Sequence, residues 1–183
     1  MRGQSHLCLG RYLVRHYMHT APKACIHAFL IGCLEPDRNP FTYLKGSIRH
    51  QWLRGHNYRN ARRFMKRISW RLEHKSRWNL FDYYTLGKLI HYTADAFTHA
   101  HNADFPTRLS DHREYEASLQ DHFLEYMSQE PKVNPVVADS IMNVICCYHR
   151  DYEQSTCSVQ NDSRFALTAC CCVLAVLLAG PKL

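Results

Sequence analysis

The chain has little glycine and proline, and it lacks the paired cysteines of a disulfide-bonded secreted domain. Seven glycines and seven prolines among 183 residues exclude collagen-like and low-complexity classes. Nine cysteines are present, but the number is odd and no CxxC pair occurs. A disulfide framework is therefore not expected, and we predict reduced, mostly buried thiols in a cytosolic protein.

The sequence also lacks the motifs of several common enzyme classes. It contains no GxSxG nucleophile elbow, no P-loop and no GxGxxG dinucleotide fingerprint. An HD-type phosphohydrolase needs adjacent His-Asp, whereas this chain has only the reverse order, at Asp111-His112 and Asp121-His122. These absences argue against serine-hydrolase, nucleotide-binding and HD-type chemistry.

Long uncharged runs are scarce. The first apolar run, residues 7–14, is interrupted by Gly10 and Arg11, so it does not predict a secretory signal peptide. Residues 165–179 carry no charge, but this run is shorter than the roughly 20 residues of a bilayer span. We expect it to form a buried core helix, with membrane contact as the alternative.

The remaining composition suits a globular helical protein, with 46% apolar residues in a length sufficient for one domain. Apolar residues recur every three or four positions, and no segment shows the period of a strand. Helices are predicted over residues 6–19, 23–34, 57–74, 78–99, 110–129 and 136–152, with a last helix beginning near 161–163. Residues 35–40 are predicted to form a turn, because they contain two prolines. We therefore predict an all-α fold, a single multi-helix domain spanning residues 1–183.

Positive charge is concentrated in one part of the chain. From Arg49 to Arg77 there are ten basic residues and one acidic residue, Glu73. A solvated outer helix face explains such a run, and attraction to an anionic membrane surface or to phosphate groups is the functional alternative. Nucleic-acid binding is not specifically indicated, since aromatic residues are not interleaved on the charged face.

Histidine is unusually frequent, with 13 residues, and several histidines stand at ligand spacing from carboxylates. His91 and Asp95 lie four residues apart and share one face of a predicted helix, as do His112 and Glu116. His101 lies between the two pairs. Imidazole and carboxylate are good zinc ligands, so this arrangement predicts a buried site for more than one metal ion.

Residues 91–102, HYTADAFTHAHN, resemble the signature of the bacterial zinc-dependent phospholipase C family, which is related in fold to the S1/P1 nucleases. That signature has His-Tyr-x-x-Asp, a His six residues after the Asp, and His-x-x-x-Glu on the next helix, matched here by His112 and Glu116. Upstream, Pro36-Asp37 is similar to the family's Pro-Asp turn, and His50 is similar to the ligand His that follows. The start of the chain, with His6, resembles the leading His of shorter members.

The resemblance implies two or three zinc ions. His50, His91 and Asp95 would hold one ion, and Asp95 would bridge to a second that takes an N-terminal ligand. His6 is the best candidate for that ligand, ahead of His16 and His19. A third ion would be held by His101, His112 and Glu116.

The resemblance also orders two alternatives that the residues alone leave open. Family spacing favours His101 over His99, and it favours His50 over His56. Asp37 would lie next to the metals as a ligand or as the base that activates water.

The function implied is a zinc-dependent phosphoester hydrolase in which metal-activated water attacks phosphorus, with a phospholipid as substrate. An S1/P1-type nuclease would use the same metals on nucleic acid. A helical protein with non-catalytic zinc is the third hypothesis. The sequence predicts a cytoplasmic protein, with contact to an anionic membrane surface through the basic stretch as the alternative.

Overall fold

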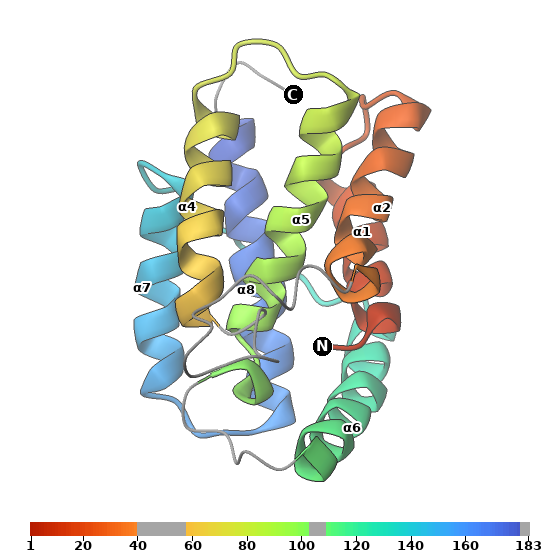
Figure 1. The fold of residues 1–183 in the computed structure, drawn as a ribbon, viewed down its shortest axis with the longest axis vertical. Helices are drawn as coiled ribbons and strands as arrows, with labels where there is room; N and C mark the ends of the chain where they lie inside the picture. Colours follow the sequence, from red (N-terminus) through yellow and green to blue (C-terminus); the bar gives the residue numbers. More distant parts are fainter. Residues whose placement is uncertain (40–57, 103–108, 180–183) are drawn as a thin grey trace.

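The chain forms a bundle of α-helices in this computed structural model, which describes residues 1–39, 58–102 and 109–179 (Figure 1). The elements are, in order, α1 (Gly3–Tyr17), α2 (Lys23–Arg38), α4 (Tyr58–Glu73), α5 (Leu80–Ala96), the 3-10 helix η1 (His99–His101), α6 (Leu109–Ser128), α7 (Ile141–Glu153) and α8 (Val159–Leu178). The described ranges contain no strand. The predicted all-α fold class is confirmed.

The predicted turn at residues 35–40 was wrong in its first half, because α2 continues through Pro36 to Arg38. Proline in the last turn of a helix removes few intrahelical hydrogen bonds, and the backbone N–H of Asn39 still donates to the Glu35 carbonyl at 2.9 Å. Pro36 is itself buried, so its ring adds to the core. As a result, Asp37 is held on a helix instead of in a loop.

Helix α7 begins later than predicted. The prediction placed its start at Val136, but the helix begins at Ile141. Ser140 is the N-cap, and its hydroxyl accepts a hydrogen bond from the Asn143 N–H. Val136 and Val137 are both exposed, so their apolar character does not report a buried helix face.

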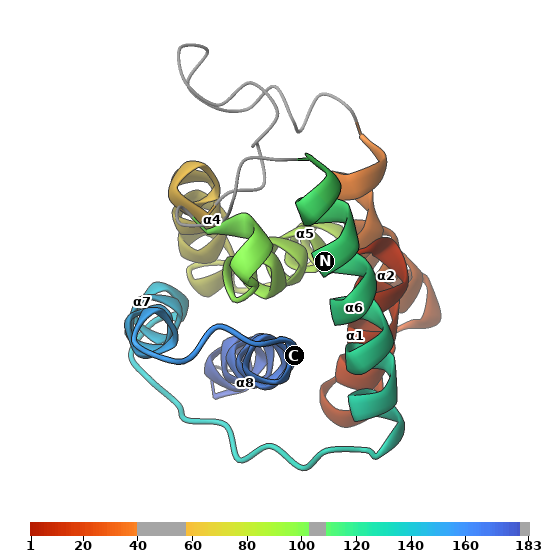
Figure 2. The ribbon, with the colours of Figure 1, turned by 90° about the horizontal axis from the view of Figure 1, so that it is seen from below.

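Helix α5 runs through the middle of the bundle, with α2, α4 and α8 around it (Figure 2). Thirteen of its 17 residues are buried. Its start is fixed by a capping box, in which Asn79 accepts from the Asp82 N–H and Asp82 accepts from the Asn79 N–H. A helix enclosed in this way is normally apolar all round, so its buried polar residues point to a special role.

Helices α2 and α5 approach each other closely at two glycines. A Cβ atom on Gly32 would stand 2.1 Å from the Tyr84 carbonyl oxygen, and one on Gly87 would stand 2.1 Å from the Phe29 carbonyl oxygen. Both obstacles are backbone atoms, which cannot rotate away. Only glycine permits this separation, which brings the C-terminal part of α2 against the buried polar residues of α5.

Helix α8 packs inside the bundle against α5, α6 and α7. Its residues from Cys170 to Leu174 have no exposed surface. By length and composition alone α8 would also suit a membrane span. All nine cysteines lie in the described ranges, and none forms a disulfide.

Replacing Gly32 or Gly87 with alanine should destabilise the fold. The added methyl group forces α2 and α5 apart, and we expect a loss of about 3 kcal/mol in the free energy of unfolding, measured by urea denaturation. Gly3→Ala is the control, because its Cβ would meet only the side chains of Leu34 at 3.6 Å and Asp37 at 4.0 Å, both ordinary contacts. Equal stability of all three variants would contradict the close approach.

Candidate metal centre

Two polar residues on the innermost helix form the centre of the site. His91 and Asp95 lie one turn apart on α5, both without exposed surface, and His91 Nε2 stands 3.1 Å from Asp95 Oδ2. A buried carboxylate is costly unless charged or polar groups surround it. Its neighbours come from three other parts of the fold.

The Asp95 group consists of His6, Asp37, His91 and Asp95. His6 comes from α1 and places Nε2 at 3.2 Å from Asp95 Oδ1. Asp37 comes from the end of α2 and places Oδ1 at 3.5 Å from His91 Nε2. The two imidazole rings stack with centroids 3.8 Å apart. One ligand atom from each of the four residues fits within a 4.8 Å cluster.

The Glu116 group consists of His101, His112 and Glu116. His112 and Glu116 lie one turn apart on α6, with Nε2 and Oε1 separated by 3.5 Å. His101 on η1 stands 3.8 Å from Glu116 Oε1 and 3.8 Å from Asp95 Oδ2. The second distance joins the Glu116 group to the Asp95 group, so the two clusters form one continuous centre.

Hydrogen bonds orient two of the histidines. His91 Nδ1 lies 2.9 Å from the Cys33 carbonyl oxygen, which can only accept, so Nδ1 carries the proton. The Thr98 hydroxyl donates to the Asp95 carbonyl at 2.9 Å, so it accepts from His101 Nδ1 at 2.7 Å. Both rings therefore carry a proton on Nδ1 and direct Nε2 to the centre, which is the orientation that a metal-binding histidine requires.

His6 provides a separate test of whether these residues suit a metal. Neither of its ring nitrogens makes a hydrogen bond within the described structure, although the side chain is buried. Burial and the neighbouring His91 lower the pKa of His6 to about 4, so the ring is neutral at pH 7. A buried, neutral imidazole without a hydrogen-bond partner is unusual, and a metal ion would supply the missing partner.

The spacing of the ligand atoms also suits zinc. Zinc bonds of about 2.0–2.1 Å in a tetrahedron place neighbouring ligand atoms about 3.4 Å apart. Nitrogen–oxygen separations across the centre run from 3.1 Å to 3.8 Å. The donor set of imidazoles and carboxylates is the one that zinc prefers, so the residues present fit the ion.

The electrostatic field of the centre is shown by the groups around Asp95. Burial alone would raise the pKa of Asp95. The pKa is nevertheless held well below its usual range by three nearby groups: His101, the Met1 amino group and His91. The Met1 nitrogen lies 2.6 Å from Asp95 Oδ1 and 3.4 Å from Glu116 Oε1. Burial opposes the charged amine, yet the carboxylates raise its pKa to about 10. The centre therefore attracts cations strongly.

Asp162 holds the elements that carry the Glu116 group. This buried carboxylate in the first turn of α8 accepts the His99 backbone N–H at 2.9 Å and the Tyr115 hydroxyl at 2.8 Å. Its other oxygen accepts the Tyr152 hydroxyl at 2.7 Å. Because His99 begins η1 and Tyr115 precedes Glu116, Asp162 fixes the relative positions of η1 and α6.

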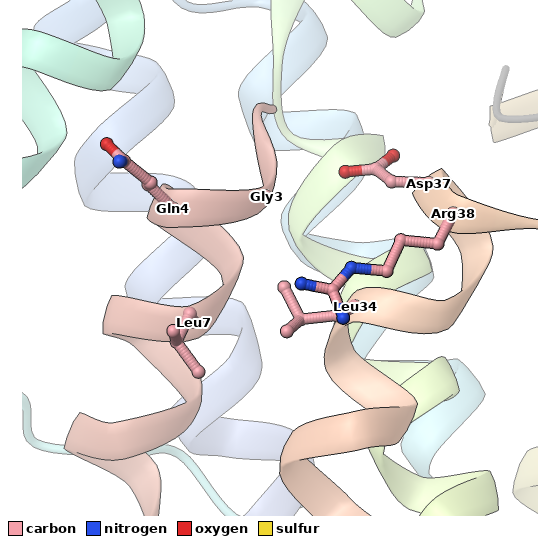
Figure 3. Close-up of a pocket in the computed structure, with 6 residues that line it drawn as sticks. All are labelled: Gly3, Gln4, Leu7, Leu34, Asp37 and Arg38. Carbon is pink, nitrogen blue, oxygen red and sulfur yellow. The ribbon is translucent and has the colours of Figure 1, made fainter.

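A pocket of about 230 Å³ adjoins the Asp95 group between the start of α1 and the end of α2 (Figure 3). Its lining is Gly3, Gln4, Leu7, Leu34, Asp37 and Arg38. Asp37 is thus shared between the pocket and the centre, with a side chain that is 24% exposed. Figure 3 shows the Arg38 guanidinium beside Leu34, on the same side of α2 as the pocket.

Of the residues expected from the sequence, seven lie together here: His6, Asp37, His91, Asp95, His101, His112 and Glu116. His50 and its alternative His56 lie outside the described residues. Between the other two alternatives, the structure brings His101 to the centre, while the His99 backbone binds Asp162. His16 instead contacts Glu130, at 3.4 Å.

Sequence reasoning missed the groups that support the ligands. The Cys33 carbonyl is a backbone group, so no residue type in the sequence indicates that it binds His91. Thr98 was not singled out, although it lies three residues before His101. The sequence analysis placed Asp162 only near the start of the last predicted helix, yet an acid that precedes a long apolar run is a signal for a buried partner.

A family model described as zinc dependent phospholipase C matches residues 5–170. The chain therefore belongs to the zinc-dependent phospholipase C family. Membership indicates zinc dependence and a hydrolase that acts on phosphoesters, and it implies a phospholipid substrate. Comparison with curated proteins and with solved structures gave no significant match.

The lowered pKa of His6 predicts a pH dependence of stability in the metal-free protein. The unfolded chain binds the His6 proton below about pH 6.5 and the folded chain only below about pH 4. The unfolded state therefore takes up more protons in this window, and stability falls as the pH is lowered through it. We expect His6 to contribute about 3 kcal/mol to this loss.

Urea denaturation in the presence of a chelator, between pH 6.5 and pH 4, measures this effect. The stability of His6→Asn should vary less with pH than that of the wild type. The exposed His16→Asn should behave like the wild type. An unchanged pH profile in His6→Asn would contradict the neutral, buried state of His6.

Proposed function

We propose that the chain acts as one domain, over residues 1–183, and hydrolyses the phosphodiester of a phospholipid on the glycerol side of phosphorus. The observation that carries this proposal is the continuous centre, in which the Asp95 and Glu116 groups meet beside an open pocket. Two adjoining cation sites suit the attacking and leaving oxygens of a phosphoryl transfer.

The ligands follow from the two groups. His6, His91 and Asp95 would hold zinc in the Asp95 group, with His50 as the further ligand expected from the sequence. His101, His112 and Glu116 would hold zinc in the Glu116 group. Because Asp95 directs Oδ1 toward His6 and Oδ2 toward His91 and His101, its carboxylate is shared, which suits two or three ions.

Zinc bound in the centre would supply positive charge that acidifies water and polarises the phosphoryl oxygens. Asp37 would accept the proton of the attacking water, and its contacts with both His91 and the pocket support this role. The new phosphorus–oxygen bond forms as the bond to the glycerol oxygen breaks. The leaving glycerol oxygen takes up a proton, and the phosphate stays on the headgroup.

The pocket suits a headgroup better than a whole lipid. At about 230 Å³ it is smaller than the roughly 300–1,000 Å³ pockets that enclose drug-sized ligands. Arg38 offers a guanidinium for an anionic phosphate oxygen, while Leu7 and Leu34 offer apolar contact. The acyl chains would then remain outside the pocket.

Elemental analysis of the purified protein tests the metal centre. The wild type should carry two or three zinc ions per chain. His91→Ala should lose zinc from the Asp95 group and His112→Ala should lose zinc from the Glu116 group, so each falls by at least one ion. His27→Ala, at an exposed position on α2, is the control. A wild-type protein without zinc, or a zinc content that stays the same in His91→Ala and in His112→Ala, would contradict the proposal.

Hydrolysis of a water-soluble, short-chain phosphatidylcholine tests the activity. Asp37→Asn should lower kcat by about 10²–10⁴-fold, the usual contribution of a general base. Glu130→Gln, an exposed carboxylate that pairs with Arg15, should keep wild-type activity. Cleavage of single-stranded DNA without release of phosphocholine would instead indicate an S1/P1-type nuclease.

A further inference from the structure

The exposed face of α4 carries a dense row of positive charge. Six basic residues of α4 are exposed: Arg59, Arg62, Arg63, Lys66, Arg67 and Arg71. Of these, Arg71 pairs with Asp82 on α5 at 3.0 Å. The one acidic residue of α4, Glu73, accepts the Ile141 backbone N–H and so lies on the side of α7. Among the described residues, no carboxylate pairs with Arg63, Lys66 or Arg67.

The opposite face of α4 fixes this orientation. Ala61, Met65, Ile68 and Leu72 are buried at a spacing of three to four residues. They belong to the hydrophobic core, and α4 packs against α5 on this side. Helix α4 lies at the outer edge of the bundle (Figures 1 and 2), and its basic side chains are exposed.

Large apolar side chains stand exposed at the C-terminal end of the same face. Trp70 is 63% exposed and stacks on His74. Leu80 and Phe81, in the first turn of α5, are each more than half exposed. The Arg71 guanidinium lies 5.1 Å above the Phe81 ring, which places Phe81 beside the basic row.

We propose that this surface, the basic row with Trp70, Leu80 and Phe81, binds the protein to an anionic lipid surface. Lys and Arg side chains near such a surface each contribute about fivefold to the partition coefficient. Tryptophan prefers the boundary between lipid headgroups and acyl chains. The inference goes beyond the proposed hydrolase activity and does not depend on it.

The composition of the surface favours lipid over nucleic acid. Binding to single-stranded nucleic acid uses several aromatic side chains in succession, on which bases stack. The surface exposes two large aromatic residues, Trp70 and Phe81, which stand on different helices and not in succession, since Tyr58 and Phe64 are half-buried. Leu80 and Phe81 add apolar area that a lipid interface accommodates and a phosphate backbone does not.

The position of the metal centre relative to α4 follows from one ring contact. Phe64 on α4 packs edge-to-face on Tyr92, with ring centroids 5.2 Å apart. Tyr92 is next to His91 in the Asp95 group. The Asp95 group therefore lies behind the N-terminal half of α4, on the side away from the charged face.

Vesicle co-sedimentation tests the proposal, with vesicles of phosphatidylcholine alone and of phosphatidylcholine mixed with phosphatidylserine. The wild type should bind the mixed vesicles, and added salt should weaken the binding. Arg63→Gln/Arg67→Gln should lower the partition coefficient about 30-fold. The control Arg11→Gln/Arg164→Gln removes the same charge from exposed positions on α1 and α8, and it should bind like the wild type.

Tryptophan fluorescence adds a second measurement. Emission should shift to shorter wavelength with mixed vesicles, and the shift should largely disappear in Trp70→Phe. Equal binding to both vesicle types, equal losses in the two double variants, or tighter binding to single-stranded DNA than to mixed vesicles would each overturn the proposal. Hydrolysis of short-chain phosphatidylcholine should be unchanged in Arg63→Gln/Arg67→Gln, so a failure of docking is distinguishable from a failure of the activity.

Discussion

The burial of one carboxylate, Asp95, is the constraint on which the site depends. An unpaired buried charge would cost several kcal/mol, so the fold must bring compensating groups to it from elsewhere. Those groups come from α1, from α5 itself and from η1, through His6, His91 and His101. Each element must reach the same point for the carboxylate to be tolerated, and that convergence is also what a polynuclear metal centre needs.

Backbone packing sets the accuracy of this convergence. The glycines at the α2–α5 contact let the Cys33 carbonyl approach His91, and this hydrogen bond selects the ring tautomer. On the other side of the centre, Asp162 holds η1 and α6 through the His99 N–H and Tyr115. The ligands are thus oriented by helix contacts as well as by their own side-chain torsions, an arrangement that favours rigid, preorganised metal sites.

Local spacing in the sequence was sufficient to predict the helices and the two His–carboxylate pairs. His91 with Asp95 and His112 with Glu116 are recognised because four residues make about one helical turn. His6 and Asp37 are different, since their approach to Asp95 depends on how α1 and α2 pack. They were predicted from the resemblance to a family, and the fold brings both to the centre.

Other features had no usable signal in a single sequence. A proline such as Pro36 normally predicts the end of a helix, but this one stands in the last turn of α2, where few hydrogen bonds are lost and its ring is buried. The roles of the Cys33 carbonyl and of Asp162 arise from long-range contacts between helices. Trp70 carries no local signal either, because its significance depends on which face of α4 is covered by α5.

Zinc titration of the metal-free Asp95→Asn variant tests the account most directly. If one carboxylate is shared by both groups, this variant should lose tight binding in the Asp95 group and in the Glu116 group together. Glu116→Gln, by comparison, should lose binding in the Glu116 group alone. A full complement of zinc bound by Asp95→Asn with wild-type affinity would contradict the shared centre.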